Sequence, residues 1–221
     1  MLAIFLAPIY ILLNIYVLRW GYLWIGNCHH LFQSRIFRII LTVIYTLIAL
    51  TPLTGFLIRK PAFLHRILKI TSNYFLGIFM YILMVLFSID IVRLILKYAV
   101  HASWIQSRIV FAAVGACCIC IVIIISFSGI YHAKHIKVTP YKITVDKSAP
   151  DMDSLKIVLL ADTHFGYNSG AVHAQEIVDK INEQQPDLVC IAGDIFDNEY
   201  DAVRELSLIH ISEPTRLQLI S

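Results

Sequence analysis

Long apolar segments dominate the first part of the chain. Four of them, at about 2–24, 36–58, 69–98 and 107–132, can cross the hydrocarbon core of a bilayer, which takes about 20 helical residues. Backbone groups that face lipid must be hydrogen-bonded within their own segment, so these segments are predicted to be helices. Residues 1–132 are therefore predicted to form a four-helix transmembrane region.

After residue 132 the pattern becomes mixed. Residues 133–153 read as a linker, in which the apolar–polar alternation at 141–145 predicts a short extended strand. Residues 155–160 and 188–192 are continuous apolar runs, which are typical of strands buried in a parallel sheet.

The segment between these two apolar runs has a helical pattern. Within 171–184 one stripe carries the apolar side chains, and Pro186 ends the segment; the stripe consists of Val172, Ile177, Val178 and Ile181. A strand, a helix and a strand at this spacing predict a right-handed βαβ unit within 154–205.

Charge separates the same two regions. Residues 1–141 hold one acidic residue, Asp90, against twelve Lys and Arg, whereas residues 142–205 hold thirteen Asp and Glu against five Lys and Arg. The net charge of +3 is thus an average over two unlike domains. No nucleic-acid-binding surface is expected on the acidic domain, because such surfaces cluster Lys and Arg.

The polar residues inside the predicted membrane helices include Asp90, Arg93 and Asn14. Asp90 and Arg93 are three positions apart on one helical face, where they can form an ion pair. Intramembrane charges are often functional, but near the end of a segment we interpret this pair as structural. Asn14 is predicted to form a hydrogen bond between helices.

Two short polar motifs stand directly after the two predicted strands. The first is Asp162-Thr163-His164, and the second is Gly193-Asp194-Ile195-Phe196-Asp197. Ligands bind at the carboxyl ends of parallel strands, so these carboxylates and the imidazole are expected to lie together at one sheet edge. Carboxylate and imidazole suit a hard-to-borderline divalent metal.

In these motifs, and in the stretch LKIVLLADTHFG…INEQQPDLVCIAGDIFD, the chain resembles the calcineurin-like metallophosphoesterase family, and in particular its bacterial membrane-anchored branch. That branch usually has Ser-Asp where this chain has Ala161-Asp162. The resemblance implies a multi-pass α-helical membrane domain followed by the first βαβ unit of an α/β (αββα sandwich) phosphoesterase domain. The family's later motifs, GNH and two further histidine motifs, are absent from the 221 residues.

The resemblance also implies roles for the motif residues. Asp162 and His164 would bind one metal ion, Asp194 would bridge two, and Asp197 would orient a histidine of the later GNH motif. The implied cofactors are two divalent ions (Mn, Fe or Zn), and the implied reaction is hydrolysis of a phosphoester by a metal-activated hydroxide. A membrane anchor is compatible with a lipid-linked phosphoester as the substrate. With only these ligands, the 221-residue chain itself is expected to be inactive.

The last residues have a different origin in our interpretation. Residues 206–216 read LSLIHISEPTR, which is the translation, residue for residue, of a transposase sequencing adaptor, and Ile220-Ser221 fits the bases that follow its index. We therefore interpret 206–221 as a non-native tail and residues 154–205 as the N-terminal part of a truncated phosphoesterase domain.

Two other function classes stay open. The soluble part could be a degenerate, non-catalytic binding module, or the four helices could form a sensor or transporter. The small excess of Lys and Arg in the predicted loops on the side of the soluble domain favours a cytoplasmic location for that domain at a bacterial cell membrane.

Overall fold

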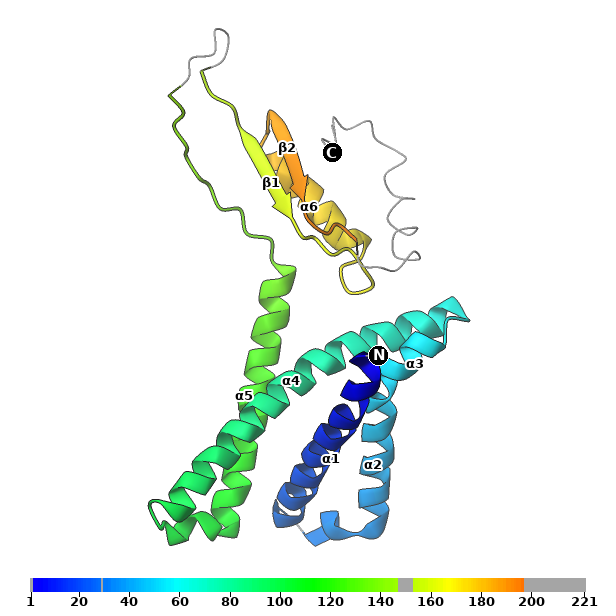
Figure 1. The fold of residues 1–221 in the computed structure, drawn as a ribbon, viewed down its shortest axis with the longest axis vertical. Coiled ribbons are helices and arrows are strands. Elements are labelled where there is room, and N and C mark those ends of the chain that lie inside the picture. The colour runs from blue at the N-terminus through cyan, green and yellow to red at the C-terminus, as the bar shows by residue number, and fades with distance from the viewer. Residues whose placement is uncertain (1, 29, 147–152, 197–221) are drawn as a thin grey trace. The chain divides into compact units, whose positions relative to one another are not determined.

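The computed structural model describes residues 2–28, 30–146 and 153–196. The chain divides into two compact units, Met1–Ile130 and Tyr131–Ser221. The first is helical, and the second holds the only sheet among the described residues (Figure 1).

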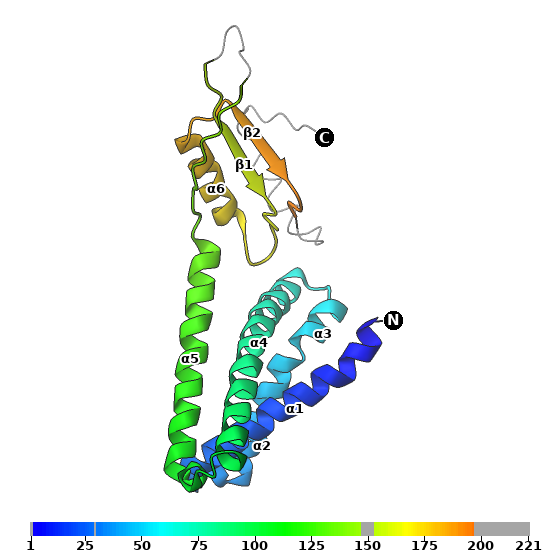
Figure 2. The same ribbon diagram turned by 60° about the vertical axis from the view of Figure 1, so that its left-hand side comes forward.

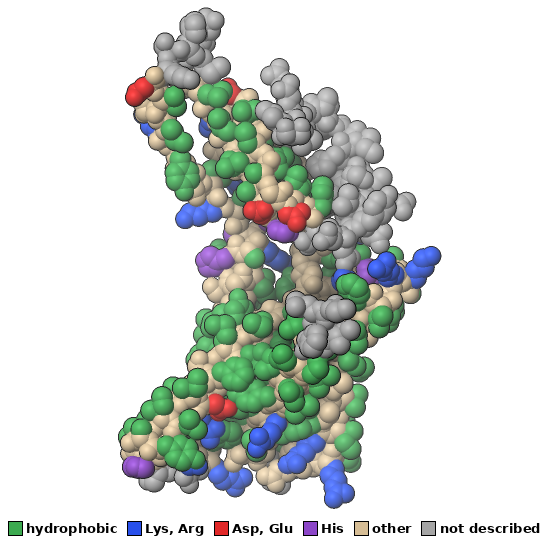
Figure 3. All heavy atoms as spheres, viewed as in Figure 1, with side chains coloured by type: hydrophobic (Ala, Val, Ile, Leu, Met, Phe, Trp, Pro, Cys, Tyr) green, Lys and Arg blue, Asp and Glu red, His purple; other side chains and the backbone are tan. Residues whose placement is uncertain are grey.

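The helical unit is built from long apolar helices. Its elements are α1 (Leu2–Cys28), α2 (Arg35–Ala49), α3 (Thr51–Leu57), α4 (Ala62–Tyr98) and α5 (Arg108–Lys134), with short 3₁₀ turns η1 (His30–Gln33) and η2 (Ser103–Gln106). Three helices, α1, α4 and α5, are long and apolar enough to cross a membrane. Figure 3 shows apolar side chains over much of this unit and Lys and Arg gathered toward its ends, as in membrane-spanning helices.

The second predicted span is not one straight helix. In place of a single helix over 36–58, α2 ends at Ala49 and α3 begins at Thr51, bent by 47°. The cause is Pro52, which has no N–H and whose ring clashes with the carbonyl four residues earlier. That carbonyl, of Ile48, accepts a hydrogen bond from the Thr51 hydroxyl at 2.7 Å instead. The bent pair can form a fourth crossing if it counts as one span.

Polar contacts tie the helices together where apolar packing alone would not fix their register. The Tyr45 hydroxyl donates to Asn14 Oδ1 at 2.8 Å, which confirms the predicted bond between helices, and the Tyr10 hydroxyl donates to the carbonyl of Ala49 at 2.7 Å. Around Trp20, Leu86 and Cys118 the side chains form a buried cluster.

The second unit is the predicted βαβ arrangement. Strands β1 (Ile157–Ala161) and β2 (Leu188–Ala192) pair in parallel, from Ile157 opposite Leu188 to Ala161 opposite Ala192. Helix α6 (Ala171–Glu183) lies along one face of the pair (Figure 2). Its Ala174 and Ile177 are buried, as expected for the apolar side of an amphipathic helix.

The linker differs from its prediction. Helix α5 extends to Lys134, and residues 141–145 form no strand although their side chains alternate. A strand needs a partner for its backbone groups, and in the described part of the chain β1 and β2 pair only with each other. Tyr141 and Ile143 are accordingly more than 80% exposed, at 85% and 82%.

Candidate metal centre

The two polar motifs run side by side beyond the ends of the strands. The Asp162 amide donates to the carbonyl of Ala192 at 3.1 Å, and the His164 amide donates to the carbonyl of Asp194, also at 3.1 Å. The Phe165 amide then donates to the carbonyl of Ile195 at 2.8 Å. Parallel pairing therefore continues into the loops and holds the motifs together, although they are far apart in sequence.

The backbone turns sharply at this edge. Asp162, His164 and Gly193 have φ angles of 48°, 43° and 76°. For a residue with a side chain the left-handed region costs about 1–2 kcal/mol, although Asp and His enter it more readily than most. Such conformations cluster at functional sites.

Position 193 requires glycine because of its positive φ angle and because a neighbouring side chain leaves no room for a Cβ. A Cβ at position 193 would overlap the carboxylate of Asp162. The close approach lets Asp162 Oδ1 accept a hydrogen bond from the Asp194 amide at 3.0 Å. This bond fixes one carboxylate of the first motif against the backbone of the second.

Asp194 lies close to both residues of the first motif. Its Oδ2 atom is 3.9 Å from His164 Nδ1, and the side chains of His164 and Asp194 are 54% and 61% exposed. Figure 3 shows acidic and histidine side chains together at the end of the sheet. The structure thus brings together Asp162, His164 and Asp194, as the sequence predicted, at a solvent-accessible edge.

Hydroxyl groups that the sequence analysis did not identify hold the loops in place. Thr163 Oγ1 donates to the carbonyl of Ile195 at 3.1 Å, which links the two motifs a second time. Ser169 Oγ donates to the carbonyl of His164 at 2.9 Å and accepts from the Gly166 amide at 3.2 Å. A Ser among Gly and Asn is a general loop signal, but it does not indicate which carbonyl the hydroxyl will contact.

The donor chemistry of the edge fits a divalent metal, whereas the side-chain arrangement fits it only in part. Two carboxylates and one imidazole are ligands that Mn, Fe and Zn all accept. Among the described residues, however, no three His, Cys, Asp or Glu side chains converge closely enough to hold one ion, because the Asp162 carboxylate is turned toward the Asp194 amide. Asp197, the fourth predicted site residue, lies outside the described residues.

Comparison with known proteins identifies the family. The sequence model of the calcineurin-like phosphoesterases matches residues 155–218, a range that contains both motifs. Over this range the chain is similar to the calcineurin-like phosphoesterase family. The matched range also includes part of 206–221, the segment that we interpret as translated adaptor.

Relatives of this calcineurin-like segment include membrane proteins. It is 38% identical over 68 residues to a zebrafish (Danio rerio) transmembrane protein with metallophosphoesterase domain, covering 31% of this chain and 16% of that protein. A protein of the same name from Bos taurus is 39% identical over 67 residues, 30% of this chain and 15% of that one. An uncharacterized metallophosphoesterase of Campylobacter jejuni is 40% identical over 60 residues, 27% of this chain and 16% of the relative.

These matches cover a minor part of this chain and a smaller part of each relative. The matched part of the chain spans about a sixth of the length of these curated relatives, and no solved structure matches the chain. The chain is a membrane protein with a calcineurin-like phosphoesterase segment. The bacterial membrane-anchored branch stays a prediction, since two of these relatives are vertebrate proteins.

Proposed function

We propose that this chain is part of a membrane-anchored dinuclear-metal phosphoesterase. The observation that carries the proposal is the parallel pairing of β1 and β2, which puts Asp162, His164 and Asp194 at one sheet edge within a segment that matches the family. The long apolar helices of the first unit would hold this segment at the membrane.

The proposed chemistry assigns each side chain a task. Asp162 and His164 would supply an oxygen and a nitrogen ligand to one ion, and Asp194 would supply its carboxylate to both ions. Two bound divalent metals would supply a hydroxide nucleophile near neutral pH and a clamp for the phosphoryl oxygens. Gly193 would keep the two loops close enough for Asp194 to reach both positions, and Asp197 would orient a histidine outside the 221 residues.

Metal binding by the 221-residue chain is the first test. Titration with Mn²⁺, followed by electron paramagnetic resonance, should show one ion per chain, bound by Asp162, His164 and Asp194. Asp194→Asn should weaken binding by roughly tenfold or more, because it removes a charged ligand. Asp179→Asn is the matched control, since Asp179 lies on α6 and its carboxylate bonds to Gln175 at 2.9 Å. Equal loss in both variants would contradict the assignment of the site.

The catalytic part of the proposal is tested on a longer gene product. The gene should be read past the codon for residue 205, and its full product assayed with bis(p-nitrophenyl) phosphate and Mn²⁺. Asp194→Asn should reduce turnover by roughly 10³-fold, which corresponds to about 4 kcal/mol of transition-state stabilisation. Full turnover in that variant would exclude the proposed mechanism.

A non-catalytic binding module is the second candidate. It is favoured by one observation: within the described residues the three side chains do not converge on a single point. A degenerate relative would lack the GNH motif, so the downstream gene sequence separates the two candidates. Metal binding without turnover by the full-length product would support the binding module.

A further inference from the structure

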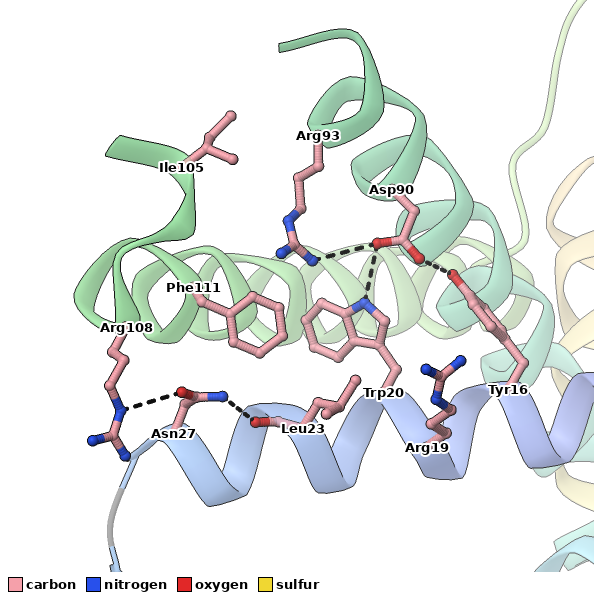
Figure 4. Close-up of a pocket in the computed structure, with 10 residues that line it drawn as sticks. All are labelled: Tyr16, Arg19, Trp20, Leu23, Asn27, Asp90, Arg93, Ile105, Arg108 and Phe111. Carbon is pink, nitrogen blue, oxygen red and sulfur yellow. Dashed lines mark hydrogen bonds and ion pairs between the residues drawn. The ribbon is translucent and has the colours of Figure 1, made fainter. Parts of the chain in front are cut away.

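The helical unit contains a cavity that neither the proposed catalysis nor the family match explains. It has a volume of about 330 Å³ and lies between α1, α4, η2 and α5, as Figure 4 shows. This volume is at the lower end of the range for ligand sites. Three arginines line it, one from each long helix: Arg19, Arg93 and Arg108.

The one acidic residue of the cavity wall already has partners. Asp90 Oδ2 accepts from the Tyr16 hydroxyl at 2.8 Å, and Asp90 Oδ1 accepts from the Trp20 indole at 3.4 Å. Arg93 Nη1 lies 3.7 Å from Asp90 Oδ1, which confirms the predicted pairing. Asp90 therefore compensates one of the three positive charges, and the described residues supply no counter-charge to the other two.

The two remaining arginines are positioned to bind an anion. Arg108 Nε donates to a neutral group, the Asn27 amide oxygen, at 3.4 Å. In the part of the chain that the structure describes, Arg19 pairs with no carboxylate, and its guanidinium points toward the cavity (Figure 4). Arginine binds phosphate through paired N–H donors, so the cavity has the charge and the donors for a phosphate group.

The position of the cavity indicates where that phosphate would come from. Arg108 is the first residue of α5, and Arg93 lies close to the end of α4 at Tyr98. Trp20 lines the cavity, and Trp104 lies on η2 beside it. Tryptophan and arginine at the ends of spanning helices are typical of the headgroup layer of a bilayer, so we expect the cavity to lie at the depth of lipid phosphates.

A second, smaller cavity of about 90 Å³ adjoins the first. The two share Arg93, Ile105 and Phe111, and the remaining wall of the smaller one is apolar, with Val92 and Leu96 among its side chains. A cationic cavity next to an apolar one matches an amphiphile, with its phosphate in the first and its glycerol and upper chain in the second. A free phosphate ion would leave the smaller cavity unused.

We propose that this cavity binds the headgroup phosphate of an anionic phospholipid. The test is a titration of the full 221-residue chain in neutral detergent, followed by native mass spectrometry. The probes are dioleoyl phosphatidylglycerol, dioleoyl phosphatidylcholine, glycerol 1-phosphate and inorganic phosphate. Phosphatidylglycerol should bind roughly tenfold or more tightly than phosphatidylcholine, because the trimethylammonium group of the latter adds a positive charge to a positive site.

Substitutions make the assignment specific. Arg19→Gln and Arg108→Gln should each weaken phosphatidylglycerol binding by roughly tenfold, the usual loss for one charge-assisted contact. Arg35→Gln is the matched control, because Arg35 is an exposed arginine at the start of α2 and does not line the cavity. Circular dichroism should show unchanged helix content in all three variants.

Removing the negative charge of Asp90 distinguishes a phosphate-binding site from a group of arginines that only stabilises the helices. Asp90→Asn keeps the size of the side chain and its acceptor for Tyr16, but it releases the charge of Arg93. Phosphatidylglycerol should then bind several-fold more tightly. Weaker binding in Asp90→Asn, or equal losses in Arg35→Gln and Arg19→Gln, would overturn the site. Glycerol 1-phosphate or inorganic phosphate binding as tightly as the lipid would overturn the lipid as its source.

Discussion

Gly193→Ala is the most direct test of the geometry at the sheet edge. The φ angle of 76° puts alanine in the left-handed region, at a cost of about 1–2 kcal/mol. The new methyl group would also overlap the Asp162 carboxylate and break its hydrogen bond to the Asp194 amide. That exposed bond contributes about 1 kcal/mol.

Together these effects should destabilise the edge by about 2–3 kcal/mol, which corresponds to a roughly 30- to 140-fold increase in local opening. Hydrogen–deuterium exchange of the full chain measures this opening. Peptides that contain the amides of Asp194 and Phe165 should exchange faster by that factor, whereas helices of the other unit should not change.

Gly170→Ala is the matched control for this experiment. Gly170 lies in the same unit, has a φ of −75°, and has open space where a Cβ would be. Alanine fits there, so exchange at the two motifs should stay within a few-fold of the original chain. Similar exchange in both variants would refute the view that Gly193 holds the motifs together.

Further predictions concern activity, the tail and the helical unit. The 221-residue chain should show little or no Mn²⁺-dependent phosphodiesterase turnover, and robust turnover that disappears in Asp194→Asn would contradict this. Deleting residues 206–221 should leave the thermal unfolding midpoint unchanged, because a segment without evolved packing contributes little burial; a clear drop would refute the adaptor interpretation, as would genomic DNA that continues into LSLIHISEPTR. Tyr45→Phe should destabilise the helical unit by about 0.6 kcal/mol and at most about 1.7 kcal/mol in dodecyl sulfate unfolding, because it removes the hydroxyl bond to Asn14. Tyr98→Phe, at an exposed tyrosine, is its control.

The βαβ unit could be predicted almost completely from the sequence. Strand β2 has the predicted bounds, β1 is shifted by one or two residues, and α6 covers the predicted segment. These elements follow from local periodicity and from Pro186, both of which act within a few residues. The juxtaposition of Asp162 and Asp194 followed as well, because the carboxyl ends of parallel strands meet at one edge.

Other features depend on contacts that are distant in sequence. The alternation at 141–145 predicts a strand, but among the described residues no strand pairs with this segment. A single helix was predicted over 36–58, whereas Pro52 separates α2 from α3. The pairing of Asp90 with Arg93 was predictable from their spacing, but its bonds to Tyr16 and Trp20 arise only when α1 packs against α4.

If α2 and α3 together form one span, the bend between them limits how thick a bilayer the helical unit can match. The 15 residues of α2 extend about 22 Å at a rise of about 1.5 Å per residue. The seven residues of α3, turned by 47°, add about 7 Å along the same direction. Even if α2 is aligned with the bilayer normal, the pair just reaches across a hydrocarbon core of about 30 Å.

The long helices differ, because α4 with its 37 residues can shorten its reach by tilting, whereas α2 and α3 cannot lengthen theirs. In a plasma membrane of about 32–33 Å the bilayer would have to thin around this pair, at fractions of a kcal/mol per Å of mismatch. A bilayer of shorter acyl chains would remove that cost. The stability of this protein should therefore depend on the acyl-chain length of the lipids, independently of their headgroup.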